Sequence, residues 1–480
     1  MPSPLRGAVL AVLAAAQFTV MLATSIVNVA LPQIRDGVGL SDSATTWVVN
    51  AYGLAFGALL LPGGRAADLL GRRRVLLAGL GTFGAASAVA VLAASPGVLI
   101  AARAVQGAGA AAVAPAALAL AVGLYAPGPA RGRALAVWGA VSGAGGAAGV
   151  VLGGLLTQAW GWPWIFRTVA IGSLAVLAAT AACVPAAGPA ERTRFDWAGT
   201  ATSALALTAL VWGLTTARRS GWTDTRVLAA FGTAAVLAGV FWRLQRAGAS
   251  PLVPPRLFAA RDVTVGNLLT GLFGTVWIAL FYFLPLYQQQ VLGQSPLTAG
   301  LGQLPLAFAN MLGAALAPAL VRLAGGRITL VAALLTEAAG MLWLSRIGAH
   351  GSFLADVLGP SVLVGLGLSV AFVQLTGLSV AGVDGSDAGL AGGLVNTTRQ
   401  VGGAVGLAVL ATVAGTATAR AAGHQPPLEA LTAGYRTAFA LGSAVLAGAA
   451  LLAALLVRRT PTADRPRRTP APEPAVPTRR

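Results

Sequence analysis

The sequence contains no lysine, one cysteine and two histidines among its 480 residues. Cys183 alone cannot form an intramolecular disulfide or a cysteine metal site, and His350 and His424 both fall in expected loops. Only 10% of the residues are charged, whereas 56% are hydrophobic and the mean hydropathy is +0.78. This composition excludes a soluble globule and a disordered chain. We expect a polytopic membrane protein that is not an enzyme and holds no metal or other cofactor.

Fourteen mostly apolar segments are long enough to cross a bilayer, which takes about 20 helical residues. They cover residues 8–32, 44–63, 75–95, 98–123, 133–157, 164–184, 197–217, 226–244, 264–290, 297–321, 328–347, 353–381, 388–416 and 433–457. The first segment has no convincing cleavage point, so we interpret it as a span rather than as a secretory signal. An even number of spans places both termini on one side.

All 32 basic residues are arginine, and with 14 acidic residues they give a net charge of +18. If the termini are cytoplasmic, 22 arginines lie on the cytoplasmic side, eight lie on the opposite side, and Arg103 and Arg399 lie within spans. The positive-inside rule therefore predicts cytoplasmic termini in the cytoplasmic membrane. Because the arginines set topology, no nucleic-acid partner is expected; the expected partners are the bilayer and a small-molecule substrate, with the chain as a monomer.

Proline and arginine mark the expected domain boundaries. Pro251, Pro254 and Pro255 prevent a helix from continuing through the connection before the ninth span. We predict an N-terminal six-span bundle at 1–190, two inserted spans at 191–246, an inner linker at 247–263, a C-terminal six-span bundle at 264–457 and a disordered Pro/Arg tail at 458–480.

Glycine, carboxylate and arginine alternate in the turn after the second span, at residues 64–74. This segment resembles the inner signature loop of the major facilitator superfamily. An aspartate there can pair with an arginine and latch the inner side shut until the transporter opens. The predicted latch comprises Gly64, Asp68, Gly71, Arg72 and Arg73, and the alternative is that the arginines serve topology alone.

Two further motifs lie in the fourth and fifth spans. Arg103, Gln106 and Gly107 share a helix face, a pattern that marks proton-coupled members of the resembled superfamily, although an arginine can also snorkel toward the membrane surface. The fifth span resembles the antiporter motif of drug exporters, with Gly149-Val150 in place of its Gly-Pro pair. We expect five glycines on one side of this helix to let another helix approach closely: Gly139, Gly143, Gly146, Gly149 and Gly153. This contact forms a gate or, alternatively, serves helix packing alone.

Residues 25–32, 251–258, 283–296 and 396–400 extend the resemblance to the fourteen-span drug:proton antiporter family of this superfamily. The resemblance implies an all-α polytopic membrane protein of the major facilitator fold, with two six-helix bundles (spans 1–6 and 9–14) and two inserted helices (spans 7–8). In the second half of the chain, the segment 318–327 follows the tenth span as the signature loop follows the second span. It carries Leu323 at the position that corresponds to Asp68. Ala23 replaces an aspartate that the family usually carries.

The resemblance implies an exporter of small amphipathic compounds, of drug or antibiotic type, that works by proton antiport and alternating access. The alternatives are a proton-independent facilitator or importer and a nontransporting scaffold or sensor. The candidates for proton coupling are Arg103, Gln106 and Glu337, the last on a span that corresponds to a peripheral support helix. The polar residues expected to contact substrate, or to hydrogen-bond between helices, are Gln17, Thr24, Asn28, Asn50, Tyr52, Tyr282, Tyr287, Gln289, Gln303, Asn310, Asn396, Arg399 and Gln400.

Overall fold

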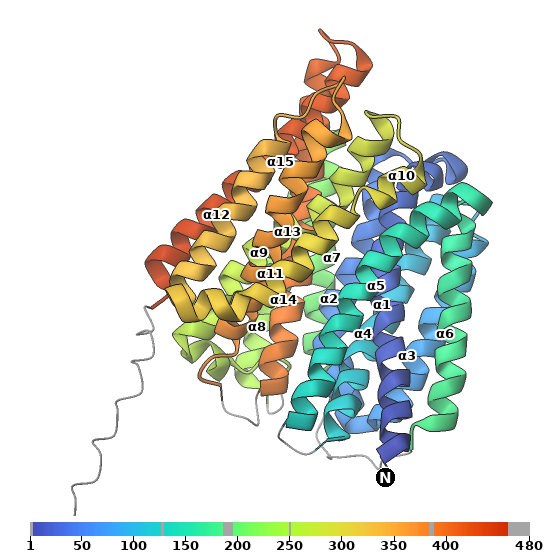
Figure 1. Cartoon of the computed structure of the whole chain (residues 1–480), viewed down its shortest axis with the longest axis vertical. Helices are drawn as coiled ribbons and strands as arrows, with labels where there is room; N and C mark the ends of the chain where they lie inside the picture. Colours follow the sequence, from blue (N-terminus) through green and yellow to red (C-terminus); the bar gives the residue numbers. More distant parts are fainter. Residues whose placement is uncertain (1–2, 126–128, 186–194, 249–250, 384–387, 459–480) are drawn as a thin grey trace, which may run out of the picture.

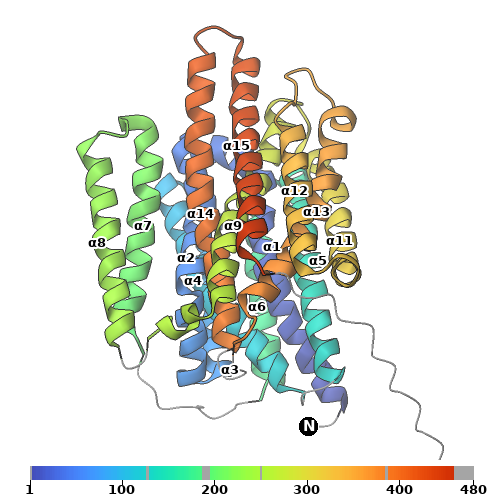
Figure 2. The ribbon, with the colours of Figure 1, turned by 90° about the vertical axis from the view of Figure 1, so that its left-hand side faces the viewer.

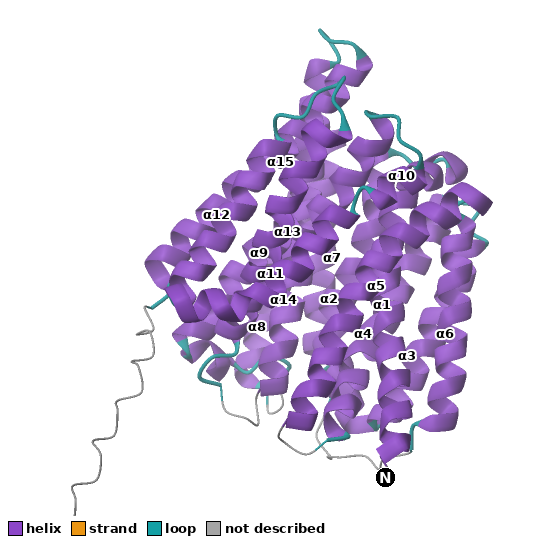
Figure 3. Cartoon of the chain, viewed as in Figure 1, coloured by secondary structure: helices purple, strands orange, loops and turns teal. Residues whose placement is uncertain are grey.

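The computed structural model of the chain describes residues 3–125, 129–185, 195–248, 251–383 and 388–458. Over these ranges the chain forms helices and their connections, without strands (Figure 3). Fourteen helical segments are long and apolar enough to cross a membrane, and they follow the predicted spans in order. The prediction of an all-helical, multi-pass membrane protein is therefore confirmed.

The helices are labelled in Figure 1. Their bounds are α1 (Ser3–Val38), α2 (Asp42–Leu70), α3 (Arg72–Val91), α4 (Pro96–Gly123), α5 (Pro129–Trp160), α6 (Pro163–Cys183), α7 (Trp197–Ser220), α8 (Thr225–Ala247), η1 (Pro255–Ala259), α9 (Arg261–Gln290), α10 (Pro296–Leu301), α11 (Leu304–Ala324), α12 (Gly326–Leu344), η2 (Phe353–Leu358), α13 (Gly359–Ser379), α14 (Ala388–Ala421) and α15 (Pro427–Leu456). The tenth span is broken into α10 and α11, where Pro305 would clash with the carbonyl of Leu301 in a continuous helix.

Two groups of helices pack within themselves. In the first, α1 lies against α5 and α6, α2 against α4, and α3 against α4 and α6; in the second, α9 lies against α13, α14 and α15, and α12 against α13 and α15. The hairpin of α7 and α8 stands at one edge, with α7 against α2 and α14 (Figure 2). The predicted domain limits stay predictions, and the segment 186–194 and the tail after Arg458 lie outside the described residues.

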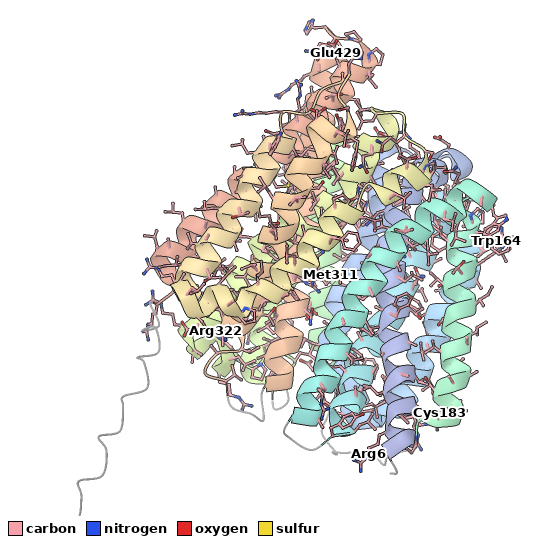
Figure 4. All side chains as sticks on the ribbon, in the orientation of Figure 1. Arg6, Trp164, Cys183, Met311, Arg322 and Glu429 are labelled. Atoms are coloured by element: carbon pink, nitrogen blue, oxygen red, sulfur yellow. The ribbon has the colours of Figure 1, made fainter. Side chains whose placement is uncertain are left out.

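Successive spans run in opposite directions, which gives the molecule an upper and a lower end in the view of Figure 1. Figure 4 shows Arg6, Cys183 and Arg322 toward the lower end, and Trp164 and Glu429 toward the upper end. The α1–α2, α5–α6, α9–α10 and α14–α15 connections therefore lie at the upper end. The α2–α3 and α11–α12 junctions lie at the lower end.

The α2–α3 junction and the α11–α12 junction each consist of a single glycine. Gly71 has φ 97° and Gly325 has φ 80°, a conformation that L side chains rarely adopt, so glycine lets the chain reverse in one residue. After each junction an arginine donates to a carbonyl near the end of a neighbouring helix: Arg73 to Ala181 O at 2.7 Å, and Arg327 to Ala454 O. The equivalent contacts, α3 with α6 and α12 with α15, fit the predicted six-span repeat.

The packing of α5 against α1 corrects the predicted glycine arc. A Cβ at Gly145, Gly149 or Gly153 would collide with α1 backbone atoms between Phe18 and Ile26. A Cβ at Gly139, Gly143 or Gly146 would meet open space, so these three do not provide the close approach that was predicted for them. The face that packs carries the spacing 145, 149, 153 because residues four apart stack along one side of a helix.

We expect Gly149→Ala to lower the stability of the protein by about 1–3 kcal/mol, since its new methyl group would overlap the carbonyl oxygen of Leu22 and the hydroxyl of Ser25. The matched control is Gly143→Ala on the same helix, where the methyl group meets no atom and we expect no loss. Thermal unfolding of the two purified variants in detergent measures the difference. Equal melting temperatures would show that α5 and α1 do not pack as described.

Candidate substrate pathway and coupling site

Arg103 is the most deeply buried charged side chain of the first group of helices. It lies on α4 and is 1% exposed. Its Nε donates to Val48 O on α2 at 2.9 Å, its Nη1 donates to Gln106 Oε1, and its Cζ lies 4.4 Å from the ring centroid of Tyr52. Such a cation–π contact is worth about 2 kcal/mol when desolvated. These partners are neutral, so they satisfy the hydrogen bonds of Arg103 without cancelling its charge.

The same cluster links four helices. Gln106 Nε2 donates to Ser87 Oγ on α3 at 2.7 Å, and Thr24 Oγ1 on α1 donates to Tyr52 Oη at 3.2 Å. Ala23, where the resembled family usually carries an aspartate, is 1% exposed beside Thr24. The predicted coupling residues Arg103 and Gln106 thus form one group with the predicted cavity residues Thr24 and Tyr52, held by hydrogen bonds and by the cation–π contact of Arg103 with Tyr52.

A second arginine cluster lies in the other group of helices. The Cζ of Arg399, on α14, lies 5.0 Å from the ring centroid of Trp277 on α9 and 5.1 Å from that of Phe372 on α13. Its Nη2 donates to Asn396 Oδ1 at 2.9 Å, and its Nε is buried without a partner in the described part of the chain. Arg399 is half-buried, in contrast to Arg103. Here too the contacts given by the structure are neutral.

Glu337 is fully buried on α12, next to the backbone of Gly367 on α13. Neither of its carboxylate oxygens has a hydrogen-bond partner among the described residues. An ionised carboxylate in such a place is strongly disfavoured. The structure does not bring Glu337 together with Arg103, which lies in the first group of helices.

The α2–α3 junction holds the predicted latch residues. Asp68 lies in the last turn of α2, not in an extended loop, and pairs with Arg72 at 3.1 Å. Arg72 also reaches Ala119 O on α4 at 3.5 Å, and Gly64 lies against Pro115 on the same helix. The contacts that the structure gives for Asp68 and Arg72 therefore lie within the first group of helices.

Several predicted cavity residues join the two groups at the upper end. Gln289 Nε2 donates to Val29 O at 2.8 Å, Gln33 Nε2 donates to Gln289 Oε1 at 3.3 Å, and the hydroxyls of Thr46 and Tyr282 are 3.2 Å apart. Gln303 donates to Gln288 within the second group, and Tyr287 donates to Gly348 O in the α12–α13 connection.

The remaining predicted residues lie deeper. Gln17 Nε2 donates to Ser142 Oγ on α5 at 3.1 Å, and Gln400 on α14 meets α2 at Gly57. Oxygens of Gln17, Asn28 and Asn50 are buried without a partner in the part of the chain that the structure describes. Asn310 is half-buried on α11. Buried amides without partners are groups that a ligand or water can satisfy.

Sequence reasoning missed several residues of these groups: Ser87, Ser142, Trp277, Phe372, Gln33, Thr46 and Gln288. A serine in an apolar helix carries no pattern of its own, and Ser87 is recognised only once α3 is seen against α4. Trp277 and Phe372 could have been suspected, since a membrane-embedded arginine needs partners and aromatic rings are among the few available in an apolar span.

Comparisons with known proteins agree with this architecture. The family model described as Major Facilitator Superfamily matches residues 13–407. The chain is 41% identical over 408 residues to the cephamycin export protein CmcT of Amycolatopsis lactamdurans, and the aligned region covers 84% of each chain. It is 38% identical over 477 residues to the puromycin resistance protein pur8 of Streptomyces alboniger, and the aligned region covers 96% of this chain and 94% of the relative. An auto-inhibited POT family peptide transporter superposes with a TM-score of 0.71 at 16% identity, over 96% of this chain and 99% of the other.

Replacing Asp68 with Asn is expected to slow transport while leaving membrane insertion and stability nearly unchanged. The side chains of Asp68 and Arg72 are 43% and 39% exposed, so solvent screens their ion pair. Its loss is expected to lower the free energy of unfolding by about 0–1 kcal/mol. The variant Asp262→Asn, which removes a carboxylate from the first turn of α9, is the matched control. Transport rates and melting temperatures of both variants are compared in proteoliposomes and detergent. An unchanged transport rate in Asp68→Asn would show that Asp68 does not act as a latch.

Proposed function

Because the chain belongs to the Major Facilitator Superfamily, we propose that it is a secondary exporter of small amphipathic organic compounds, of drug or antibiotic type, in the cytoplasmic membrane. The observation that carries this proposal is the pair of relatives at 41% and 38% identity, one named for cephamycin export and the other for puromycin resistance. Both are matched over most of their length. Transport rather than enzyme catalysis is the activity of this family.

The distribution of contacts supports alternating access. With cytoplasmic termini, the upper end faces outward, and there α1 meets α9 while α5 meets α10. The cavity at this end, between α1, α2, α9, α14 and α15, has a volume of about 100 Å³, whereas drug-sized ligands occupy pockets of about 300–1,000 Å³. Hydrogen bonds of Gln289 and Tyr282 join the two groups at this end, so export through it requires these bonds to break.

Proton antiport is proposed to supply the driving force. Glu337 is a buried carboxyl that can carry a proton. Arg103 is a buried charge whose partners belong to α2 and α4, and its partner Gln106 donates in turn to Ser87 on α3. We favour Arg103 as the coupling residue because its cluster reaches Thr24 on α1 through Tyr52, whereas Glu337 lies between α12 and α13. A proton-independent facilitator is the second candidate, supported by Ala23 at a buried position where the resembled family carries an aspartate.

The proposal is tested by efflux of puromycin and of a cephamycin from proteoliposomes that contain the purified protein. We expect efflux above that of protein-free vesicles, accelerated when a pH gradient is imposed, since inward proton movement then drives export. An efflux rate that does not depend on the pH gradient would favour the proton-independent facilitator. Absence of efflux for every tested drug-type compound would contradict the proposed export function.

Arg103→Ala is expected to uncouple transport more severely than Glu337→Gln. Removing the guanidinium breaks the group that joins α1, α2, α3 and α4, whereas Glu337→Gln replaces a carboxyl by a neutral group of similar size. The measurement is substrate-induced proton flux in vesicles, with puromycin as the substrate. If Glu337→Gln alone eliminates the flux and Arg103→Ala preserves it, Glu337 is the carrier and the coupling role of Arg103 is wrong.

A further inference from the structure

Arg399 lies near the middle of the membrane. It stacks on Trp277, which lies near the middle of α9 (Arg261–Gln290), a span of 30 residues. A bilayer core is about 30 Å thick, so this depth is roughly 15 Å from the headgroups on either side. At that depth lipid headgroups are out of reach of the side chain. The charge of Arg399 must therefore be met by the protein or by a molecule that enters the protein.

Among the residues that the structure describes, none places a carboxylate against Arg399. Of the 14 acidic residues in the sequence, Glu337 is the one near the middle of a span. Glu337 lies against Gly367 of α13, whereas Arg399 lies against Phe372 of the same helix. Five residues correspond to a rotation of roughly 140° about a helix axis, so the two charged groups contact different sides of α13. Both ion pairs found in the described ranges lie near helix ends, at Arg35–Asp42 and Asp68–Arg72.

Arg399 also retains donors that a ligand can use. A guanidinium has five N–H donors, and the side-chain acceptor that the structure gives it is Asn396 Oδ1. Its Nε is buried and has no partner among the residues that the structure describes. The side chain is half-buried rather than sealed, and Asn396 is exposed although it lies within a span. Arg103 differs, because its 1% exposure leaves no room for a ligand in this conformation.

Aromatic rings continue from the arginine along α9. Trp277 lies 5.4 Å from Phe273, 6.4 Å from Phe281 and 5.5 Å from Phe372, measured between ring centroids. Trp277 and Phe372 hold the guanidinium through their faces. The arrangement places one positive charge beside an apolar, aromatic wall, which matches an amphipathic compound with an aromatic body and one negative group.

We propose that Arg399 binds the carboxylate of a transported compound, so that the exporter prefers an amphipathic organic anion to a neutral compound of the same shape. This inference rests on the proposed export function and names the substrate class of the same pathway. Arg399 donates charge-assisted hydrogen bonds to the carboxylate, Asn396 orients the guanidinium, and the rings around Trp277 contact the apolar part of the compound. The bound carboxylate supplies the negative charge that the described residues do not place beside Arg399.

The test is direct binding to the purified protein by isothermal titration calorimetry with a matched pair of probes, 1-naphthaleneacetate and 1-naphthaleneacetamide. The two have the same shape and differ in charge. We expect the wild type to bind the carboxylate at least about tenfold more tightly than the amide, because a hydrogen bond to a charged group is worth more than one to a neutral group. Arg399→Gln is expected to bring the ratio to about one, and Arg399→Lys to keep part of the preference.

Arg346→Gln, which removes an exposed arginine at the upper end, is the control for a general loss of positive charge and is expected to keep the wild-type ratio. A wild type that binds the amide as well as the carboxylate, or binds neither, overturns the proposal, as does an unchanged ratio in Arg399→Gln. Efflux of both probes from proteoliposomes is measured in parallel. Carboxylate-selective binding without efflux removes the export function but keeps the anion site, whereas efflux without charge preference keeps the export function and removes the anion site.

Discussion

Inside a bilayer a charged side chain has only protein atoms to satisfy it, and the packing of α1 to α4 follows from this constraint at Arg103. The guanidinium donates hydrogen bonds to a carbonyl of α2 and to the side-chain amide oxygen of Gln106 on its own helix, and the amide nitrogen of Gln106 donates to Ser87 on α3. Tyr52 stacks on the charge and receives a hydrogen bond from α1. A displacement of any of the four helices would leave a buried polar group unpaired. Arg103 therefore couples their positions.

Small residues make this arrangement sterically possible. A Cβ at Gly107 would meet the carbonyl of Tyr52, and one at Gly63 would meet the carbonyl of Ala111, so α2 and α4 approach backbone to backbone. Lipid provides no hydrophobic force between helices, and close packing of small residues replaces it. The same device recurs between α9 and α14, where Gly274 lies against the carbonyl of Arg399. In both groups of helices a glycine contact thus lies beside the buried arginine or one turn away from it.

Hydropathy and periodicity predicted the number and order of the spans because the bilayer fixes both the length and the apolar character of a crossing helix. They did not predict the packing face of α5. Its glycines lie at several neighbouring positions, and only the position of α1 distinguishes Gly145 from Gly146. The partners of Arg103 and Arg399 also needed the structure, since Ser87, Trp277 and Phe372 come from helices far away in the sequence. Asp68 was predicted from its motif, but its place in the last turn of α2 depends on Gly71, which shortens the junction to one residue.

The two halves share a frame but differ in their charges. Arg73 and Arg327 make the same contact with the carbonyl of a neighbouring helix, and Gly71 and Gly325 make the same one-residue junction. The ion pair of Asp68 and Arg72 has no counterpart at α11, where Leu323 is 80% exposed. The first half also seals its arginine, whereas the second leaves Arg399 half-buried beside aromatic rings. The repeated scaffold thus carries two unequal arrangements: the first half holds a closed polar cluster and the lower-end ion pair, and the second half holds a half-buried arginine whose Nε has no partner among the described residues.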